Sequence, residues 1–342
     1  MTMQDVQYFT LTNNKGESVT LSNLGAGIIA INVPDRNGRL DNVSLAYAKG
    51  EDYYDDGPFL GKIPGRFANR IAKGRFALNG KEYNLTLNCG TEHLHGGKGD
   101  ESYANRIWNA EQEGNTVTFS LDSPDGDAGY PGNLSVKAVY KWHDDSCLTL
   151  DIYATTDATT VVNLTNHVYF DLRGASRKAD CGICNHVLKL NASRYLPTDS
   201  NLIPTGEFAP VAGTPMDFTA PKAIGKELHA DFPALNYGKG YDACWAVDGF
   251  DGNVRPIAEL SDPESGRKLV LSTNRPGVQV YTGNWLNGCP DAPDGHVYKD
   301  YDGVALECQD FPDSPNRPEF KCGPLEPGRT WHSIIKWQFS AE

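Results

Sequence analysis

The chain has 342 residues, of which 39% are hydrophobic, so it is long enough to bury a large core. Its formal net charge of −13 argues against binding to nucleic acid, which favours a basic surface, and against binding to anionic membranes. The sequence has no run of about 18 apolar residues and no basic, apolar leader, so we expect no membrane-spanning helix and no secretion signal. These features predict a cytoplasmic protein that acts on a neutral small molecule.

Eight cysteines in a chain without a leader predict reduced thiols in a cytosol. Cys181 and Cys184 have the CxxC spacing that metal-binding and redox sites use. A structural zinc site needs four ligands, usually from two such pairs, and no second pair matches this one. We therefore expect no bound metal and no cofactor.

Short apolar or alternating runs, separated by turns rich in glycine, proline and asparagine, predict β-strands along most of the chain. Asn79-Gly80 fits the tight turn of a hairpin. The predicted strands cover residues 19–24, 28–33, 76–78, 81–85, 117–121, 135–142, 147–155, 163–172, 186–190, 269–273, 278–282, 304–309 and 333–339. Residues 222–229 are the one stretch whose pattern predicts a short helix. With no repeat and no obvious linker, the pattern predicts an all-β fold, a sandwich or barrel, in a single domain over residues 1–342.

The predicted strand at 163–172 has an unusual polar face. Its alternation puts Asn163, Thr165, His167 and Tyr169 on one side and apolar residues on the other. Antiparallel sheets commonly expose one face to water, so this face either meets solvent or lines a polar cavity.

Glu307 stands in the middle of the apolar strand at 304–309. A carboxylate is costly to bury there unless it is paired or used, so the strand either faces solvent or holds a functional acid. A nearby strand shows the same alternation, with Gln279 and Tyr281 opposite two valines. Together with His167, these residues form a plausible lining for a hydroxyl-rich ligand.

Two histidines at i and i+2, His93 and His95, share a face if they lie on a strand. With Glu101 they loosely match the metal ligands of a cupin; the alternative is a histidine pair with no ligand. Flanking glycines let the backbone approach a ligand closely.

Arg66 and Arg70 lie four residues apart in a glycine-flanked loop. The guanidinium group of each could donate several hydrogen bonds to ligand oxygens or form a structural ion pair. Asp242 could be a turn residue or could hold vicinal hydroxyls. The sequence has no phosphate loop, no dinucleotide fingerprint and no nucleophilic serine elbow.

The ordered set of these pieces resembles the aldose 1-epimerase (galactose mutarotase) family. The matching stretches are 65–71, 78–81, 93–97, 163–170, 240–242, 279–284, 307–316 and 325–328. The resemblance implies a large antiparallel β-sandwich and a cofactor-independent isomerase. Such an enzyme interconverts the α and β anomers of free aldohexoses such as galactose and glucose.

Carried over by position, the resemblance implies that Glu307 is the general base and His167 the general acid. The implied sugar-binding residues are Asn69, Arg70, His95, Tyr169, Asp242 and Gln279. The reaction needs an ionised Glu and a protonated His, and ordinary pKa values of about 4.3 and 6.5 let both states coexist near neutral pH. The two states coexist more readily if neighbouring carboxylates raise the pKa of the histidine.

Three other functions remain open at this point. A non-catalytic carbohydrate-binding sandwich would need the polar face but no acid–base pair. A cupin-like enzyme would use the His93, His95 and Glu101 set. A hexose 6-phosphate epimerase of the same fold is the third, although the chain shows no basic cluster beyond Arg66 and Arg70, which favours free sugars.

Overall fold

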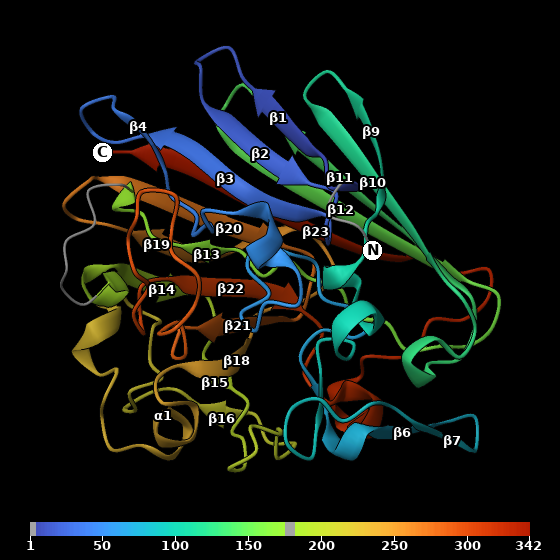
Figure 1. The fold of residues 1–342 in the computed structure, drawn as a ribbon. Helices are drawn as coiled ribbons and strands as arrows, with labels where there is room; N and C mark the ends of the chain where they lie inside the picture. Colours follow the sequence, from blue (N-terminus) through green and yellow to red (C-terminus); the bar gives the residue numbers. More distant parts are fainter. Residues whose placement is uncertain (1–4, 175–181) are drawn as a thin grey trace.

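The computed structural model describes residues 5–174 and 182–342, and strands dominate both stretches (Figure 1). Every strand pair in the described part is antiparallel. The α-helix of these residues is one short segment, α1 (Pro233–Gly238). The predicted all-β class is therefore confirmed.

The largest sheet runs in the order β17-β14-β19-β20-β23-β12-β11-β10-β9. Its strands are β9 (Asn109–Glu113), β10 (Thr116–Ser123), β11 (Leu134–Trp142), β12 (Cys147–Thr156), β14 (Val187–Leu190), β17 (Lys222–Ala223), β19 (Arg255–Ser261), β20 (Arg267–Thr273) and β23 (Trp331–Ala341). Buried and accessible residues alternate along β11 and β23, as expected when one sheet face covers the core.

A second sheet, in the order β13-β22-β21-β18-β15-β16, carries much of the candidate site. Its strands are β13 (Tyr169–Phe170), β15 (Arg194–Tyr195), β16 (Ala209–Pro210), β18 (Asp242–Ala246), β21 (Gly277–Tyr281) and β22 (Val304–Gln309). All residues of β22 are buried. The alternative in which this strand faces solvent is therefore wrong.

A third sheet, in the order β1-β2-β3-β4, lies over the large sheet, and two small ladders complete the strands (Figure 1). The bounds are β1 (Tyr8–Thr12), β2 (Ser18–Ser22), β3 (Gly27–Pro34) and β4 (Leu40–Asn42), with β5 (Arg70–Ile71) paired to β8 (His93–Leu94) and β6 (Arg75–Leu78) paired to β7 (Lys81–Asn84). Short 3-10 turns cover Gly50–Tyr53, Ala72–Gly74, Gly99–Glu101, Tyr103–Asn105, Asp127–Gly129, Gly182–Asn185, Ile224–Lys226, Ser314–Asn316 and Pro318–Phe320.

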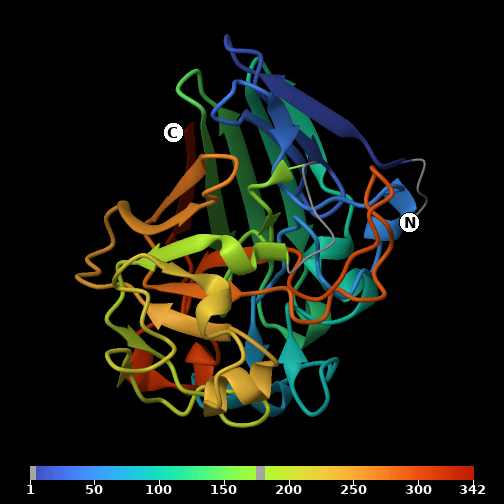
Figure 2. The same cartoon turned by 90° about the vertical axis from the view of Figure 1, so that its left-hand side faces the viewer.

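The main core joins the three sheets. It contains Ile31 of β3, Leu150 of β12, Leu306 of β22 and Trp337 of β23, each almost fully buried. Seen from the side, the blue strands of the third sheet and the green strands of the large sheet rise together, with the yellow and orange strands below them (Figure 2). This packing holds β22 rigidly from both sides.

Two sequence predictions fail in detail. Residues 222–229 contain β17 and a 3-10 turn, and the α-helix begins later, at Pro233. The segment 163–172 pairs as a strand only at β13, because Asn163 and Asn166 donate their side-chain amides to backbone carbonyls of other segments. By contrast, Asn79 and Gly80 both have positive φ in the predicted hairpin turn.

Two further expectations concern the environment of the chain. No helix in residues 5–174 or 182–342 is long and apolar enough to span a membrane. Cys184 is disulfide-bonded, so the expectation of eight reduced thiols is wrong at this residue. The other member of the predicted CxxC pair, Cys181, lies outside the described residues.

Candidate active site

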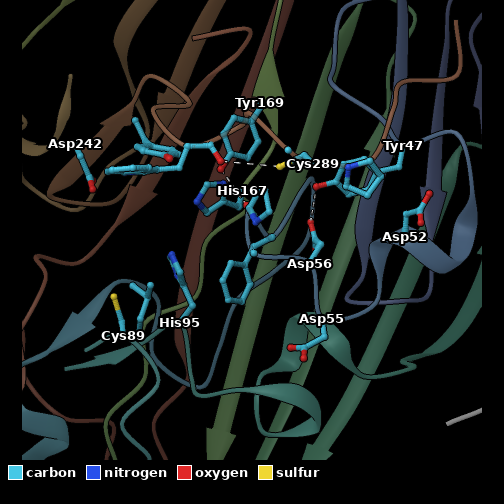
Figure 3. Close-up of a pocket in the computed structure, with 18 of the residues that line it drawn as sticks. Tyr47, Asp52, Asp55, Asp56, Cys89, His95, His167, Tyr169, Asp242 and Cys289 are labelled. Atoms are coloured by element: carbon cyan, nitrogen blue, oxygen red, sulfur yellow. Dashed lines mark hydrogen bonds between the residues drawn. The ribbon is translucent and has the colours of Figure 1, made fainter. Parts of the chain in front are cut away.

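An open cavity of about 750 Å³ lies between one end of the second sheet and the loops that follow β4 and β21 (Figure 3). This volume is typical of a small-molecule site. Buried side chains form its inner wall, which consists of His95, His167, Tyr169 and Glu307. More accessible side chains form its outer rim, which consists of Glu51, Asp52, Tyr54, Asp55 and Trp285.

His167 and Glu307 are brought together by strand pairing. Tyr169 lies opposite Ala305 in the β13–β22 ladder, and continuing that register back by two residues places His167 opposite Glu307. The His167 Nε2 and Glu307 Oε1 atoms are 3.5 Å apart, and both side chains are at most 5% exposed. The two residues predicted as acid and base are therefore neighbours in the inner wall.

Burial shifts the two pKa values in opposite directions. It lowers the pKa of His167 to about 4, and the Lys62 ammonium also lowers it. It raises the pKa of Glu307 well above its ordinary value, with help from the Asp242 carboxylate and against the effect of Arg70. A rise in the pKa of His167 from nearby carboxylates is not what the structure shows, because desolvation is the larger effect.

His95 is held as a neutral hydrogen-bond donor. Its Nδ1 accepts the backbone N–H of Asn69 at 3.2 Å, so Nε2 carries the hydrogen. Burial keeps its pKa well below the ordinary value, and its ring centre lies 5.3 Å from that of His167. The N–H of His95 is therefore free to donate to a ligand oxygen.

The same geometry bears on metal binding. Ligand atoms of His95, His167 and Glu307 lie within 4.8 Å of one another, a spacing that a metal ion could bridge. However, metal ligation needs an unprotonated imidazole nitrogen, and the nitrogen of His95 that faces the cavity, Nε2, carries the ring hydrogen because Nδ1 accepts a backbone N–H. These residues fit an acid–base site with a fixed donor better than a resident metal centre.

The predicted cupin-like set is not assembled. His93 donates from Nδ1 to the Thr86 carbonyl at 2.7 Å, and its Nε2 lies 2.7 Å from the Tyr130 hydroxyl. His95 has a φ of 51°, so the chain leaves the strand there and the two histidines do not share a face. Glu101 accepts from Thr86 instead of facing the histidines.

Arg70 and Asp242 lie at another side of the cavity, with 3.7 Å between Nη2 and Oδ2. Gln279 donates to Asp242 Oδ1 at 2.6 Å, which orients the Asp242 carboxylate. Direct contact between Gln279 and a sugar stays a prediction. Asn69 lines the cavity, and its side-chain oxygen accepts the backbone N–H of Arg70 at 2.8 Å.

Arg66 is structural. It is 1% exposed and donates to the carbonyls of Pro131 and Gly132 and to the Ser123 hydroxyl, at 2.8, 2.9 and 2.6 Å. The open choice between a ligand-binding and a structural role for the two arginines therefore resolves differently for each. Arg66 holds the fold together, and Arg70 faces the cavity.

The sequence analysis did not single out several residues that line or support the site. The ring of Phe59 lies 4.7 Å from that of His95 and 6.5 Å from that of His167, and Trp285 of the outer rim is 64% exposed. Asp56 lines the cavity and forms a buried ion pair with Lys62. The one feature of the sequence that could have indicated this pair is the position of Lys62 among apolar residues.

Comparisons with known proteins agree with this geometry. A family model described as aldose 1-epimerase matches residues 7–338. The chain belongs to the aldose 1-epimerase family. Human galactose mutarotase is 40% identical over 322 residues, which covers 94% of this chain and 91% of that protein. Aldose 1-epimerase of Escherichia coli is 37% identical over 343 residues, which covers 99% of this chain and 96% of that protein.

Solved structures of the family share the fold. An aldose epimerase homologue from C. elegans superposes with a TM-score of 0.88 at 25% identity, covering 98% of this chain and 99% of that one. A galactose 1-epimerase from Lactobacillus acidophilus gives a TM-score of 0.84 at 28% identity, with 98% of each chain covered. The predicted mutarotase-like sandwich and the predicted isomerase class are therefore confirmed.

Proposed function

We propose that this chain interconverts the α and β anomers of free aldohexoses such as galactose and glucose, with His167 and Glu307 as the acid–base pair. The observation that carries the proposal is the buried contact of 3.5 Å between these two side chains in the wall of a sugar-sized cavity. Membership of the aldose 1-epimerase family supports the reaction class.

The chemistry suits this pair. Opening a cyclic hemiacetal removes the proton of the anomeric hydroxyl and adds a proton to the ring oxygen. Glu307 is placed to take the first proton and His167 to give the second, and each transfer is worth about 10²–10⁴-fold. The step starts from carboxylate and imidazolium and ends with a carboxylic acid and a neutral imidazole.

Burial favours that final state over the ionised starting pair, since the pKa of Glu307 is raised and that of His167 is lowered. Ring opening therefore relieves the unfavourable burial of two charges, and reclosure restores both charges by returning the same two protons. Both forms of the pair hold one proton, so no exchange with solvent is needed during a turnover.

After opening, the bond between C1 and C2 must rotate before the ring recloses on the other face of the carbonyl. The site must therefore hold the hydroxyls that lie far from C1. Arg70 and Asp242 are suited to this role, with Gln279 fixing the carboxylate. Asn69, His95 and Tyr169 line the cavity, and His95 donates from Nε2 toward the ring oxygen.

The charge of the cavity favours a neutral sugar over a hexose 6-phosphate. Among the described residues that line it, Arg70 is the one lysine or arginine, and Asp242 pairs with it. Carboxylates dominate the outer rim, where they would repel a phosphate dianion. The single-domain organisation and the cytoplasmic location expected from the sequence stay predictions.

Polarimetry tests this proposal. Freshly dissolved α-galactose and α-glucose should reach their equilibrium rotation much faster with the protein than without it, and the corresponding 6-phosphates should change little. Binding of the sugars without faster mutarotation would instead support a non-catalytic carbohydrate-binding sandwich.

A further inference from the structure

A buried ion pair joins Asp56, which lines the cavity, to Lys62, and neither residue takes part in the proposed proton transfers. The Lys62 side chain is 1% exposed, and its ammonium pairs with the Asp56 carboxylate. The ammonium also donates to the Tyr53 carbonyl at 2.5 Å and to the Asn105 side-chain oxygen at 3.0 Å. All three of its protons therefore have partners.

The carboxylate of Asp56 is also fully used. Its second oxygen accepts the backbone N–H of Leu60 at 2.8 Å and the hydroxyl of Tyr47, a cavity residue, at 3.3 Å. Because Asp56 and Lys62 lie at the two ends of the 56–62 loop, their contact closes that loop.

Two backbone hydrogen bonds join the closed loop to His167. The Lys62 carbonyl accepts the backbone N–H of His167 at 2.9 Å, and Gly61 donates its N–H to the His167 carbonyl at 3.0 Å. A substituent on Gly61 would collide with the Ile28 carbonyl, so the loop and β3 are in close contact. Both backbone groups of the proposed acid are thus fixed by residues at the end of the loop.

The middle of the loop supports the side chains of the inner wall. Pro58 accepts the Tyr169 hydroxyl at 3.0 Å, and Phe59 packs its ring against His95 and His167. Phe59 holds a φ of 56°, a conformation that a non-glycine residue adopts at some cost and that the surrounding contacts must maintain. A loop without its ion pair would lose part of that support.

We propose that Asp56 and Lys62 are a positioning pair for the epimerase reaction: they lock the 56–62 loop behind His167, and their opposite charges set the protonation of the acid–base pair. This inference rests on the proposed function. It predicts an effect that a purely structural ion pair would not give, because removing the positive member and removing the negative member should change the pH profile in opposite directions.

The electrostatic part follows from the groups that face His167. Those groups are Glu307, His95, Tyr169, Tyr281 and Lys62, with Arg70 and Asp242 acting through Glu307. The Lys62 ammonium lowers the pKa of His167, and the Asp56 carboxylate is the counter-charge of that ammonium. Deleting one member exposes His167 to the uncompensated charge of the other.

The experiment compares Lys62→Met, Asp56→Asn and the double variant by polarimetry between about pH 4 and 9, after subtraction of the uncatalysed rate. Lys62→Met should move the limbs of the kcat/KM profile to higher pH, and Asp56→Asn should move them to lower pH, each by about half a pH unit or more. Each should also lower kcat about tenfold, because the acid is displaced. The double variant should have limbs close to the wild type but a reduced kcat.

Lys222 and Glu227 provide a matched control away from the cavity. Their charged groups are 2.7 Å apart, Lys222 donates to the Pro215 carbonyl at 2.7 Å, and its ammonium lies 4.2 Å from the Phe218 ring centre. Lys222→Met and Glu227→Gln should leave the pH profile and kcat unchanged. Circular dichroism and thermal melts would verify that all variants fold.

Folded Lys62→Met and Asp56→Asn proteins whose limbs stay in place, or move in the same direction, would overturn the positioning role. If Lys62→Met does not fold, Asp56→Asn and the double variant decide the question, since an unmoved profile in Asp56→Asn has the same meaning. A wild-type protein that does not accelerate mutarotation would contradict the proposed function itself, so the two failures are distinguishable.

Discussion

The inner wall and the outer rim of the cavity are built in different ways. His167, Tyr169 and Glu307 of the inner wall lie on or beside strands whose register fixes their separation. The rim residues Asp55 and Trp285 lie in loops, and neither is buried. All residues of β22 are buried, Glu307 included. Under the proposed function, the acid–base pair therefore belongs to the sheet, and we expect the loops of the rim to discriminate between sugars.

The largest effect should come from the inner wall. Glu307→Gln should lower kcat for galactose about 10³-fold or more, because it removes the proposed base while keeping the shape of the side chain. The same change should raise the melting temperature at pH 8, since a buried carboxylate with a raised pKa costs stability when it ionises. Polarimetry and calorimetry measure the two effects. Activity close to that of the wild type would contradict the assignment of Glu307 as the base.

His167→Asn should give the next largest effect. We expect kcat to fall about 10²–10³-fold with little change in sugar binding, because the acid acts on the transition state. Single-turnover polarimetry with a binding titration separates the two quantities. A loss confined to affinity would make His167 a sugar-binding residue.

The two arginines of the 65–70 loop should separate stability from binding. Arg66→Lys should cost about 3 kcal/mol in the free energy of unfolding, because several buried donors to carbonyls are lost. Arg70→Lys should leave the free energy of unfolding almost unchanged. It should raise KM about tenfold, because a lysine lacks the planar guanidinium group. Urea melts and saturation curves of both variants measure this contrast. An equal fall in stability for both would show that the cavity arginine is structural too.

As the pH falls, the inner wall should lose its contribution to folding stability before the outer rim does. The folded pKa of His167 is about 4 and its unfolded value is about 6.5, so the folded state binds fewer protons in this window. Its contribution to stability is therefore complete above about pH 6.5 and is lost as the pH falls through about 4. Melting temperatures across this range should fall less steeply in His167→Asn than in the wild type. Parallel curves would exclude His167 as a cause.

The smallest effect should come from the rim. Asp52→Asn and Asp55→Asn together should change kcat/KM for galactose by less than about threefold, because exposed charges interact weakly with a neutral ligand. For a hexose 6-phosphate the same variant should show a measurable gain that shrinks at high salt. Polarimetry at two ionic strengths checks this. No gain for the phosphorylated sugar would mean that the rim charges do not select against it.

The inner wall was largely predictable from the sequence, and the rim was not. Strand alternation drew attention to His167 and Glu307 but left a solvent-facing strand open for both, and their roles were implied only by the resemblance to the family. Phe59 and Trp285 gave no such signal, since their roles depend on loops whose path the alternation does not determine. Alternation gives the face of Gln279 but not the side-chain rotation that turns its amide toward Asp242.

The pKa of His167 was also hard to predict from the sequence, for a related reason. The sequence displays the carboxylates near a residue but not how completely water is removed from around it. In the structure, desolvation dominates, and the Lys62 ammonium comes from a segment about a hundred residues earlier in the chain. The charged neighbours of a site are therefore harder to predict than its central residues.

The strand order has a consequence for how the protein is made. β23 joins the two halves of the largest sheet by pairing with β12 on one side and β20 on the other, and it is synthesised after both of these strands. At about 5–20 residues per second, β12 waits about 10–40 s for this partner. During that interval its open edge can pair with other chains. Chaperone demand and aggregation during synthesis should therefore depend on how quickly β23 follows β12.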